Sequence, residues 1–212
     1  FSYQGANFRI RSDRYDAITQ EIVRQRSILS EYIEHQPEFL TSLAPVKLLP
    51  RAPAIVREMH GASLKTGVGP MAAVAGITAQ IAAEAALKAG AKEAIVENGG
   101  DIYLASTEEI VIGLYAGDSP LSGKLALSVT GKEMPLAICS SSGKMGHSQS
   151  MSDCDLATVT SSSAALADAA ATLACNRVTS VDRIDPVLEK IVRIPGILGI
   201  LVIKEDRVGI AG

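Results

Sequence analysis

The sequence lacks several features that mark common functional classes. It has no tryptophan and only 4% aromatic residues, so planar side chains that could stack on an aromatic ligand are few. It also lacks an excess of basic residues, because 20 Lys and Arg stand against 23 Asp and Glu, with a pI near 5.7. A nucleic-acid-binding surface needs clustered basic side chains. The composition therefore argues against a nucleic-acid partner.

Cysteine is also scarce. Cys139, Cys154 and Cys175 form no C-x-x-C pair, and no histidine stands at zinc-ligand spacing from them. An odd number of widely spaced cysteines predicts buried free thiols in a reducing compartment. Residues 1–16 have neither the apolar segment of a signal peptide nor a lipidation motif, which favours a cytoplasmic location. Whether the chain starts at its native N-terminus stays open.

One long stretch, residues 66–83, lacks charge entirely. It is almost long enough to cross a membrane, but it contains Pro70, three glycines, Thr78 and Gln80, and it is rich in alanine. This content predicts a helix buried inside the protein instead of a membrane span.

Hydrophobic periodicity and turn residues divide the chain into runs of helices and runs of strands. An amphipathic helix over 13–35 places Tyr15, Ile18, Ile22, Leu29 and Tyr32 on one face, with Asp13 as its cap. We predict further helices over 53–67, 70–89, 164–176 and 185–194, strands over 93–97, 101–106, 108–116, 124–130, 136–141 and 155–161, and a final hairpin from 197–203 and 207–212.

This order predicts an α+β fold in which a mainly antiparallel sheet is layered with Ala-rich helices. We expect a single domain over 1–212, with an N-terminal helical part at about 13–66 and a core at about 67–212.

A carboxylate stands in the middle of the alanine-rich run SAALADAAATLAC. Asp168 and Thr172 are four residues apart, so a helix projects both oxygens from one face. Two hard oxygens are an adequate, though sparse, protein contribution to a Mg²⁺ site. The alternative is a structural or solvent-facing carboxylate, which the spacing alone favours. Asp168 lies beyond the first turn of its helix, where the helix dipole no longer stabilises it strongly.

The string ENGGDIYL, at 97–104, also has two interpretations. Asn98-Gly99 between two strand-like runs predicts a hairpin turn, since both residues tolerate positive φ. Gly99 and Gly100 together also permit a close approach of the backbone to a ligand, and Asp101 could accept hydrogen bonds from a ring or a ribose.

The string GVGPMA, at 67–72, matches the dinucleotide fingerprint G-x-G-x-x-A. A Rossmann loop must follow a strand, whereas the residues before Gly67 are helical in pattern, so we reject that fold. What remains is a helix N-terminus without acidic residues, whose backbone N–H groups can receive a phosphate.

Taken in order, GVGPMAAVAG, ENGGDIYL, GKMGHSQSMSDCDLATVTS and SSAALADAAATLA make the chain similar to the FAD:protein FMN transferases, the ApbE-like proteins. The nearer resemblance is to an uncharacterised branch of this superfamily, which shares the strings PEFLTSL, GVGPMAAVAG and VENGGDI at 37–43, 67–76 and 96–102. The resemblance implies an ApbE-like fold.

The resemblance also implies site residues. Mg²⁺ would be held by Asp168 and Thr172, and Asp101 would lie close to the flavin nucleotide. The residues implied for cofactor binding are Gly67, Gly69, Pro70, Met71, Asn98, Gly99, Gly100, Asp101 and His147. Where the transferases have AKGYAVD at the helix start, this chain has PMAAVAG at 70–76, which supplies neither the lysine nor the aspartate.

We therefore expect a Mg²⁺-dependent enzyme that acts on FAD or a similar pyrophosphate. A Ser or Thr of an acceptor protein would receive FMN in a transferase, and water would be the acceptor in a hydrolase. The missing lysine removes a charge that could stabilise the transition state. That loss favours an alternative, a non-catalytic module that binds a flavin, a nucleotide or another small molecule. A third interpretation is a purely structural homo-oligomer.

Overall fold

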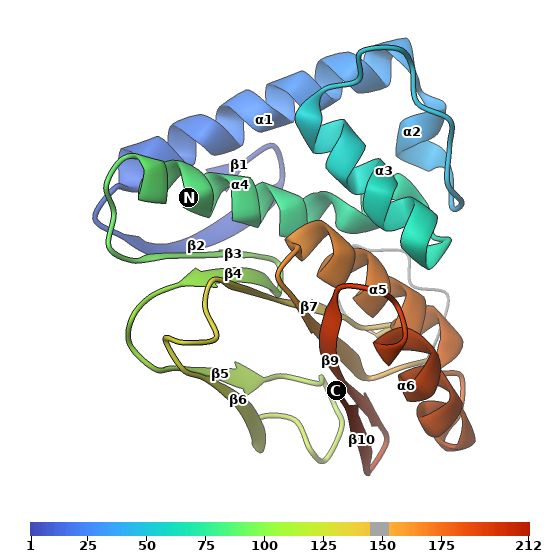
Figure 1. The fold of residues 1–212 in the computed structure, drawn as a ribbon. Helices are drawn as coiled ribbons and strands as arrows, with labels where there is room; N and C mark the ends of the chain where they lie inside the picture. Colours follow the sequence, from blue (N-terminus) through green and yellow to red (C-terminus); the bar gives the residue numbers. More distant parts are fainter. Residues whose placement is uncertain (145–152) are drawn as a thin grey trace.

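The computed structural model describes residues 1–144 and 153–212, and an eight-stranded antiparallel sheet forms its centre (Figure 1). The strand order is β1-β2-β3-β4-β7-β8-β9-β10. The strands are β1 (Ser2–Tyr3), β2 (Ala6–Ser12), β3 (Ala94–Asn98), β4 (Asp101–Ala105), β7 (Leu136–Ser141), β8 (Leu156–Ser161), β9 (Ile197–Lys204) and β10 (Arg207–Ala211).

Helices form two layers on one face of this sheet (Figure 1). They are α1 (Tyr15–His35), α2 (Glu38–Thr41), α3 (Ala54–Thr66), α4 (Val74–Lys88), α5 (Ala164–Arg177) and α6 (Ile184–Val192), with 3₁₀ turns η1 (Pro70–Ala73) and η2 (Val181–Arg183). Helices α4, α5 and α6 contact the strands, while α1 packs on α4 and α3 packs on α5. The two Ala-rich helices are therefore enclosed between the sheet and the outer helices.

A two-stranded hairpin covers part of the opposite face of the sheet. Its strands are β5 (Ile110–Leu114) and β6 (Leu125–Val129). Leu114 packs with Leu156 and Leu201 of the main sheet, and Val129 packs with Ile138. The central strands are thus covered by apolar side chains on both faces, which explains why they lack polar alternation.

Small side chains in α4 and α5 let the two helices touch. At Gly76 an added Cβ would lie 2.5 Å from the carbonyl oxygen of Ala164 and 3.0 Å from the Cβ of Asp168. Any larger residue at Gly76 would force the helices apart. This contact brings the beginning of α4 to the beginning of α5.

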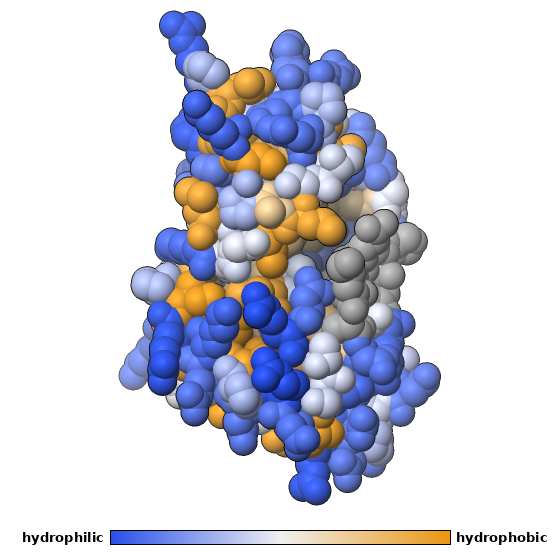
Figure 2. Space-filling view, turned by 90° about the vertical axis from the view of Figure 1, so that its right-hand side faces the viewer, coloured by the Kyte–Doolittle hydropathy of each residue, from blue (hydrophilic) through white to orange (hydrophobic). Residues whose placement is uncertain are grey.

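Among the described residues, one stretch, Pro70–Lys88, is long and apolar enough to span a membrane by length and composition. In the fold it packs between α1 and strands β3 and β4, which is the arrangement of a core helix. On the face of the molecule seen in Figure 2, polar and charged side chains surround smaller apolar areas.

The α+β class and the antiparallel sheet are confirmed, and the six individually predicted strands agree with β3 to β8 within two residues at each end. Strands β1 and β2 and the short helix α2 were not predicted. Strand β2 does carry a signal, since the buried Phe8 and the half-buried Ile10 alternate with exposed arginines. The organisation as one domain stays a prediction, supported by the packing of α1 on α4.

Two details of the first helix were predicted wrongly. Asp13 does not cap α1, because the N-cap is Arg14 without a side-chain hydrogen bond, and the Asp13 carboxylate instead lies 3.6 Å from the Arg14 guanidinium. Tyr15 is 46% exposed. The buried face of α1 includes Gln25 instead; its amide is satisfied there by Glu21, at 2.7 Å.

Candidate functional site

A tight turn places Asp101 at the beginning of β4. Strands β3 and β4 are joined by Gly99 and Gly100, whose φ angles are +66° and +103°, and Asn98 pairs with Asp101. Positive φ at both turn residues is the geometry of a type I′ hairpin. The predicted hairpin is confirmed, but its turn is Gly99-Gly100 instead of Asn98-Gly99. Asn98 and Asp101 consequently belong to the strands, and both are buried.

Asn98 connects this hairpin to helix α4. Its side-chain amide donates a hydrogen bond to the carbonyl oxygen of Ala75, at 3.3 Å. On the other side, β4 pairs with β7 up to Ile102 and Ile138, so the antiparallel register brings Asp101 next to Cys139. The carboxylate is therefore held among β4, β7 and the first turn of α4.

Asp168 approaches the same point from helix α5. It is 8% exposed, and its Oδ2 accepts a hydrogen bond from the backbone N–H of Gly76, at 2.9 Å. The solvent-facing interpretation of this carboxylate is thus wrong. Asp168 instead stabilises the N-terminus of a neighbouring helix, α4, where a negative charge is favourable. The helix start predicted to receive a phosphate, around residues 69–72, is the 3₁₀ turn η1 in the structure, and α4 itself begins at Val74. In the first turn of α4, the Gly76 amide is already bonded to a side chain.

Asp101 and Asp168 are close enough to repel each other when both are charged. Burial raises the pKa of Asp101 well above its ordinary value, and the Asp168 charge raises it further, while hydrogen bonding to Cys139 and Ser140 lowers it. Burial raises the pKa of Asp168 to about 7, against the opposing effect of the Gly76 and Ala75 amides. Ionisation of one of these carboxyl groups therefore opposes ionisation of the other.

Cys139 is the third buried group at this point. Burial raises the pKa of its thiol well above the ordinary value, and the charges of Asp101 and Asp168 raise it further. The thiol therefore stays protonated, and its Sγ donates to the Ala164 carbonyl oxygen at 3.6 Å. A protonated thiol is a hydrogen-bond donor here and not a metal ligand.

One oxygen of the carboxylate pair has no partner. Asp101 Oδ1 is buried and makes no hydrogen bond. The described residues contain no group of three or more His, Cys, Asp or Glu side chains placed to hold a metal ion, so the side chains of the described part supply only part of a coordination sphere. Two carboxylates with an unpaired oxygen fit a hard cation such as Mg²⁺, which keeps waters or substrate phosphates as its remaining ligands.

The other predicted residues lie as follows. Gly67 is the exposed left-handed C-cap of α3, with φ +79°. Gly69 is buried against the backbone of Ser42, where an added Cβ would lie 1.9 Å from the carbonyl oxygen. In η1, Pro70 is buried and Met71 half-buried; Thr172, one turn after Asp168, is also half-buried. His147 lies outside the described residues.

The structure thus brings together Asn98, Asp101 and Asp168, and their assignment to a ligand stays a prediction. Three residues of the site were not predicted: Gly76, Gln80 and Cys139. Gly76 donates to Asp168, Gln80 accepts from the first residue of α5, and Cys139 lies beside Asp101. A signal existed for Gln80, because it is the one amide side chain in the uncharged stretch 66–83. Nothing local indicated Cys139, whose neighbours come from distant parts of the chain.

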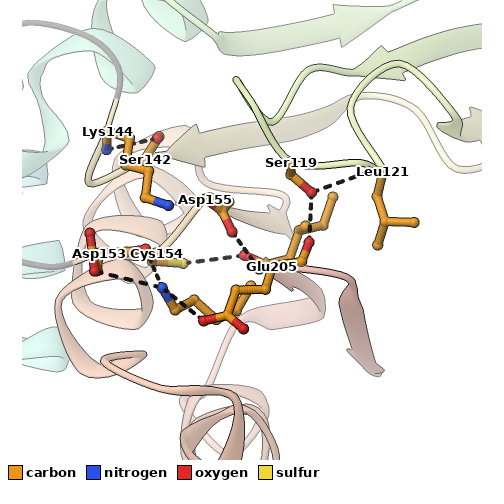
Figure 3. A network of polar contacts seen from close by, with 10 residues as sticks. Ser119, Leu121, Ser142, Lys144, Asp153, Cys154, Asp155 and Glu205 are labelled. Atoms are coloured by element: carbon orange, nitrogen blue, oxygen red, sulfur yellow. Dashed lines mark hydrogen bonds and ion pairs between the residues drawn. The ribbon is translucent and has the colours of Figure 1, made fainter.

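A second buried carboxylate, Asp155, lies elsewhere, near Lys144 and the turn between β9 and β10 (Figure 3). Asp155 Oδ1 lies 2.8 Å from the Lys144 ammonium, and its Oδ2 accepts from the Glu205 amide at 2.5 Å. Ser119 donates to the Glu205 carbonyl oxygen, at 2.8 Å. We call Asp155, Lys144, Glu205 and Ser119 the Asp155 cluster. Both oxygens of the Asp155 carboxylate have a partner in it.

Comparison with known proteins identifies the family. A family model described as "AbpE bacteria" matches residues 5–190. A UPF0280 protein of Methanococcus maripaludis is 44% identical over 195 residues, covering 90% of this chain and 79% of that protein. A UPF0280 protein of Methanocella arvoryzae is 41% identical over 191 residues, covering 90% and 78%.

Solved structures share the fold at low identity. The flavin transferase ApbE from Vibrio cholerae has a TM-score of 0.61 and 15% identity, covering 100% of this chain and 94% of that chain. The ApbE protein from Thermotoga maritima has a TM-score of 0.52 and 17% identity, covering 68% and 50%. These similarities establish an ApbE-like fold, and the sequence relatives establish the branch. The chain belongs to the ApbE-like family, in the branch that contains the UPF0280 proteins.

Proposed function

We propose that this protein binds a flavin nucleotide such as FAD, or a similar pyrophosphate, together with Mg²⁺, and that it acts on that nucleotide as a transferase or hydrolase. The observation that carries the proposal is the buried pair Asp101 and Asp168 beside the start of α4, with Asp101 Oδ1 unpaired. Carboxylates that repel each other in a buried site gain most from a divalent cation between them.

The chain's own groups would orient the cation. Asp168 keeps one oxygen on the Gly76 amide, which fixes the direction of the other, as an outer hydrogen bond does at metal sites. Asp101 offers its unpaired Oδ1, and Thr172 stands one turn further along α5. When bound, Mg²⁺ supplies Lewis-acid stabilisation of charge on phosphate oxygens.

The ligand class follows from the surroundings of the pair. A cation held by only two protein carboxylates has room for phosphate oxygens in its coordination sphere. The Gly99-Gly100 turn has no side chains, and an added Cβ would meet no atom within 4 Å at either residue. A ligand can therefore approach the backbone closely there. FAD enters this proposal through the names of the structural relatives, which are described as flavin transferases.

A non-catalytic binding module is the second candidate. It is favoured by the string PMAAVAG at 70–76, which lacks a basic residue at the start of the helix. Without such a charge near the phosphates, binding could persist while the transition state for phosphoryl transfer loses stabilisation.

Products separate the two candidates. Purified protein is incubated with FAD and Mg²⁺, with and without a cell extract that supplies acceptor proteins. AMP and FMN are measured by chromatography, and calorimetry on the purified protein measures FAD binding. We expect AMP from the wild type and none from Asp168→Asn. Binding without AMP would select the module, and absence of both would contradict both candidates and favour the structural homo-oligomer.

The chromatogram also distinguishes the acceptor. Free FMN in equal amount to AMP indicates that water is the acceptor, whereas AMP without free FMN indicates that FMN has been transferred to a protein. We also propose a cytoplasmic location, supported by three buried cysteines that form no disulfide among the described residues.

A further inference from the structure

Helices α4 and α5 cap each other. The Gly76 N–H in the first turn of α4 donates to Asp168 of α5, at 2.9 Å. In return, the Ala164 N–H at the start of α5 donates to the side-chain oxygen of Gln80 on α4, at 2.8 Å. The first N–H groups of a helix have no partner within their own helix, so each helix satisfies one such group of the other.

The backbone of Ala164 is fixed at both of its polar groups. Its N–H is bonded to Gln80, its carbonyl oxygen accepts from the Cys139 thiol at 3.6 Å, and Gly76 leaves no space for it to move toward α4. The N-cap Ser163 satisfies a different amide, that of Leu166, at 3.4 Å. Gln80 is therefore the side chain that holds the first residue of α5.

The position of Ala164 determines where Asp168 points. The two residues are one helical turn apart and lie on the same face of α5. The Gln80 amide is itself oriented, because its Nε2 donates to Glu84 at 2.8 Å, which directs Oε1 toward Ala164. A chain of contacts thus runs from Glu84 through Gln80 and Ala164 to Asp168.

We propose that Gln80 is a positioning residue for Asp168: by capping α5 it keeps the Asp168 carboxylate in reach of both the Gly76 amide and the metal position beside Asp101. The metal part of this inference rests on the proposed function. The hydrogen-bond part does not, since it concerns only contacts within the chain.

The test compares Gln80→Leu with Gln80→Glu. Leucine removes the acceptor, whereas glutamate keeps an oxygen for the Ala164 N–H. Two quantities are measured on the full chain: hydrogen exchange of the Gly76 amide by NMR, without ligand, and the affinity for Mg²⁺ in the presence of FAD, by calorimetry.

We expect Gln80→Leu to speed exchange of the Gly76 amide and to weaken Mg²⁺ binding about 10-fold, the usual cost of losing an outer partner at a metal site. Gln80→Glu should restore both only in part, because it keeps the acceptor for the Ala164 N–H but loses the donor to Glu84. A matched control is Leu29→Ala in α1, which truncates a buried side chain that is distant in the sequence from Gln80 and Asp168. It should lower the Tm and leave both measured quantities unchanged.

The inference would be overturned if Gln80→Leu kept the wild-type exchange rate of the Gly76 amide and the wild-type affinity for Mg²⁺. It would also be overturned if Leu29→Ala changed both quantities as much as Gln80→Leu does. If the wild type does not bind Mg²⁺ at all, the proposed function fails, and the exchange measurement alone decides whether Gln80 positions Asp168.

Glu84→Ala is a second test of the inference, because it removes the contact that orients Gln80 while leaving the capping oxygen in place. We expect it to produce a smaller change in the same direction, and a change in the opposite direction would contradict the proposed chain of contacts.

Discussion

Two groups of residues with buried carboxylates differ in the partners that the rest of the chain provides for the carboxylate oxygens. In the Asp155 cluster each oxygen has a partner, a lysine ammonium on one side and a backbone amide on the other (Figure 3). In the pair formed by Asp101 and Asp168, the nearest charge has the same sign, and one oxygen is left without a hydrogen bond. The aspartates of both clusters are buried: Asp155 is 3% exposed, Asp101 6% and Asp168 8%.

The difference is the one expected between a structural carboxylate and a ligand-binding one. A buried charge is tolerated when protein groups compensate it, as they do around Asp155. A buried carboxylate pair without compensation costs folding free energy, and such sites are characteristic of ligand and catalytic centres. We infer that the Asp155 cluster stabilises the fold, whereas the Asp101–Asp168 pair is completed by something that binds.

The largest effect is expected from Asp168→Asn. It should weaken Mg²⁺ binding in the presence of FAD by about 100-fold, or about 2.7 kcal/mol, and abolish the increase in Tm that ligand and metal produce together. The unfolding free energy of the free protein should hardly fall, because asparagine keeps an acceptor for the Gly76 amide. An unchanged ligand-dependent Tm shift would contradict the assignment of Asp168 to a ligand site.

Asp155→Ala should do the opposite. It leaves the Glu205 amide without its acceptor, so we expect the free energy of unfolding in urea to fall by about 2 kcal/mol. The Tm shift caused by Mg²⁺ and FAD should remain. Asp155→Asn is the matched control, since it keeps an acceptor for that amide and should lose less. Loss of the ligand response at unchanged stability would assign Asp155 to the site.

Features of the fold and of the site could be predicted from the sequence where they are caused by residues that are close together in the chain. Strands, turns and the two Ala-rich helices follow from residues that are neighbours in the chain, and they are predicted well. Asp101 was singled out for the glycines before it, which also form the turn. Spacing alone favoured a structural or solvent-facing carboxylate at Asp168, and the site assignment came from the family resemblance.

What could not be predicted depends on contacts across the chain. The capping of α4 by Asp168 requires α5 to pack on Gly76, and no local pattern specifies which helix will lie there. The same holds for Cys139, whose thiol meets Asp101 only because β4 and β7 are paired.

The pH dependence of stability provides a third test, with a smaller effect. The pKa of Asp168 is about 7 in the folded protein, against an ordinary value of 3.8. The folded state therefore binds more protons than the unfolded state between these pH values. Its contribution to the free energy of unfolding therefore falls as pH rises from about 4 to about 7.

In the presence of EDTA, the free energy of unfolding should fall more in the wild type than in Asp168→Asn, by about 1 kcal/mol between pH 6 and pH 7. Mg²⁺ with FAD should flatten the wild-type profile, because a cation compensates the charges that form. Urea unfolding at several pH values measures these slopes, and parallel profiles for the two proteins would show that Asp168 does not titrate in this range.

Lys144→Gln should have the smallest effect. The Lys144 side chain is 45% exposed, so solvent screens its ion pair with Asp155, and exposed pairs contribute little to stability. A glutamine can still donate to Asp155 Oδ1, and water can reach the position that the ammonium leaves. We expect the Tm to change by less than about 3 °C, well below the change in Asp155→Ala. A loss as large as that of Asp155→Ala would mean that the countercharge, and not the backbone amide, keeps Asp155 buried. The absence of a countercharge at Asp101 and Asp168 would then be the property that distinguishes the two clusters.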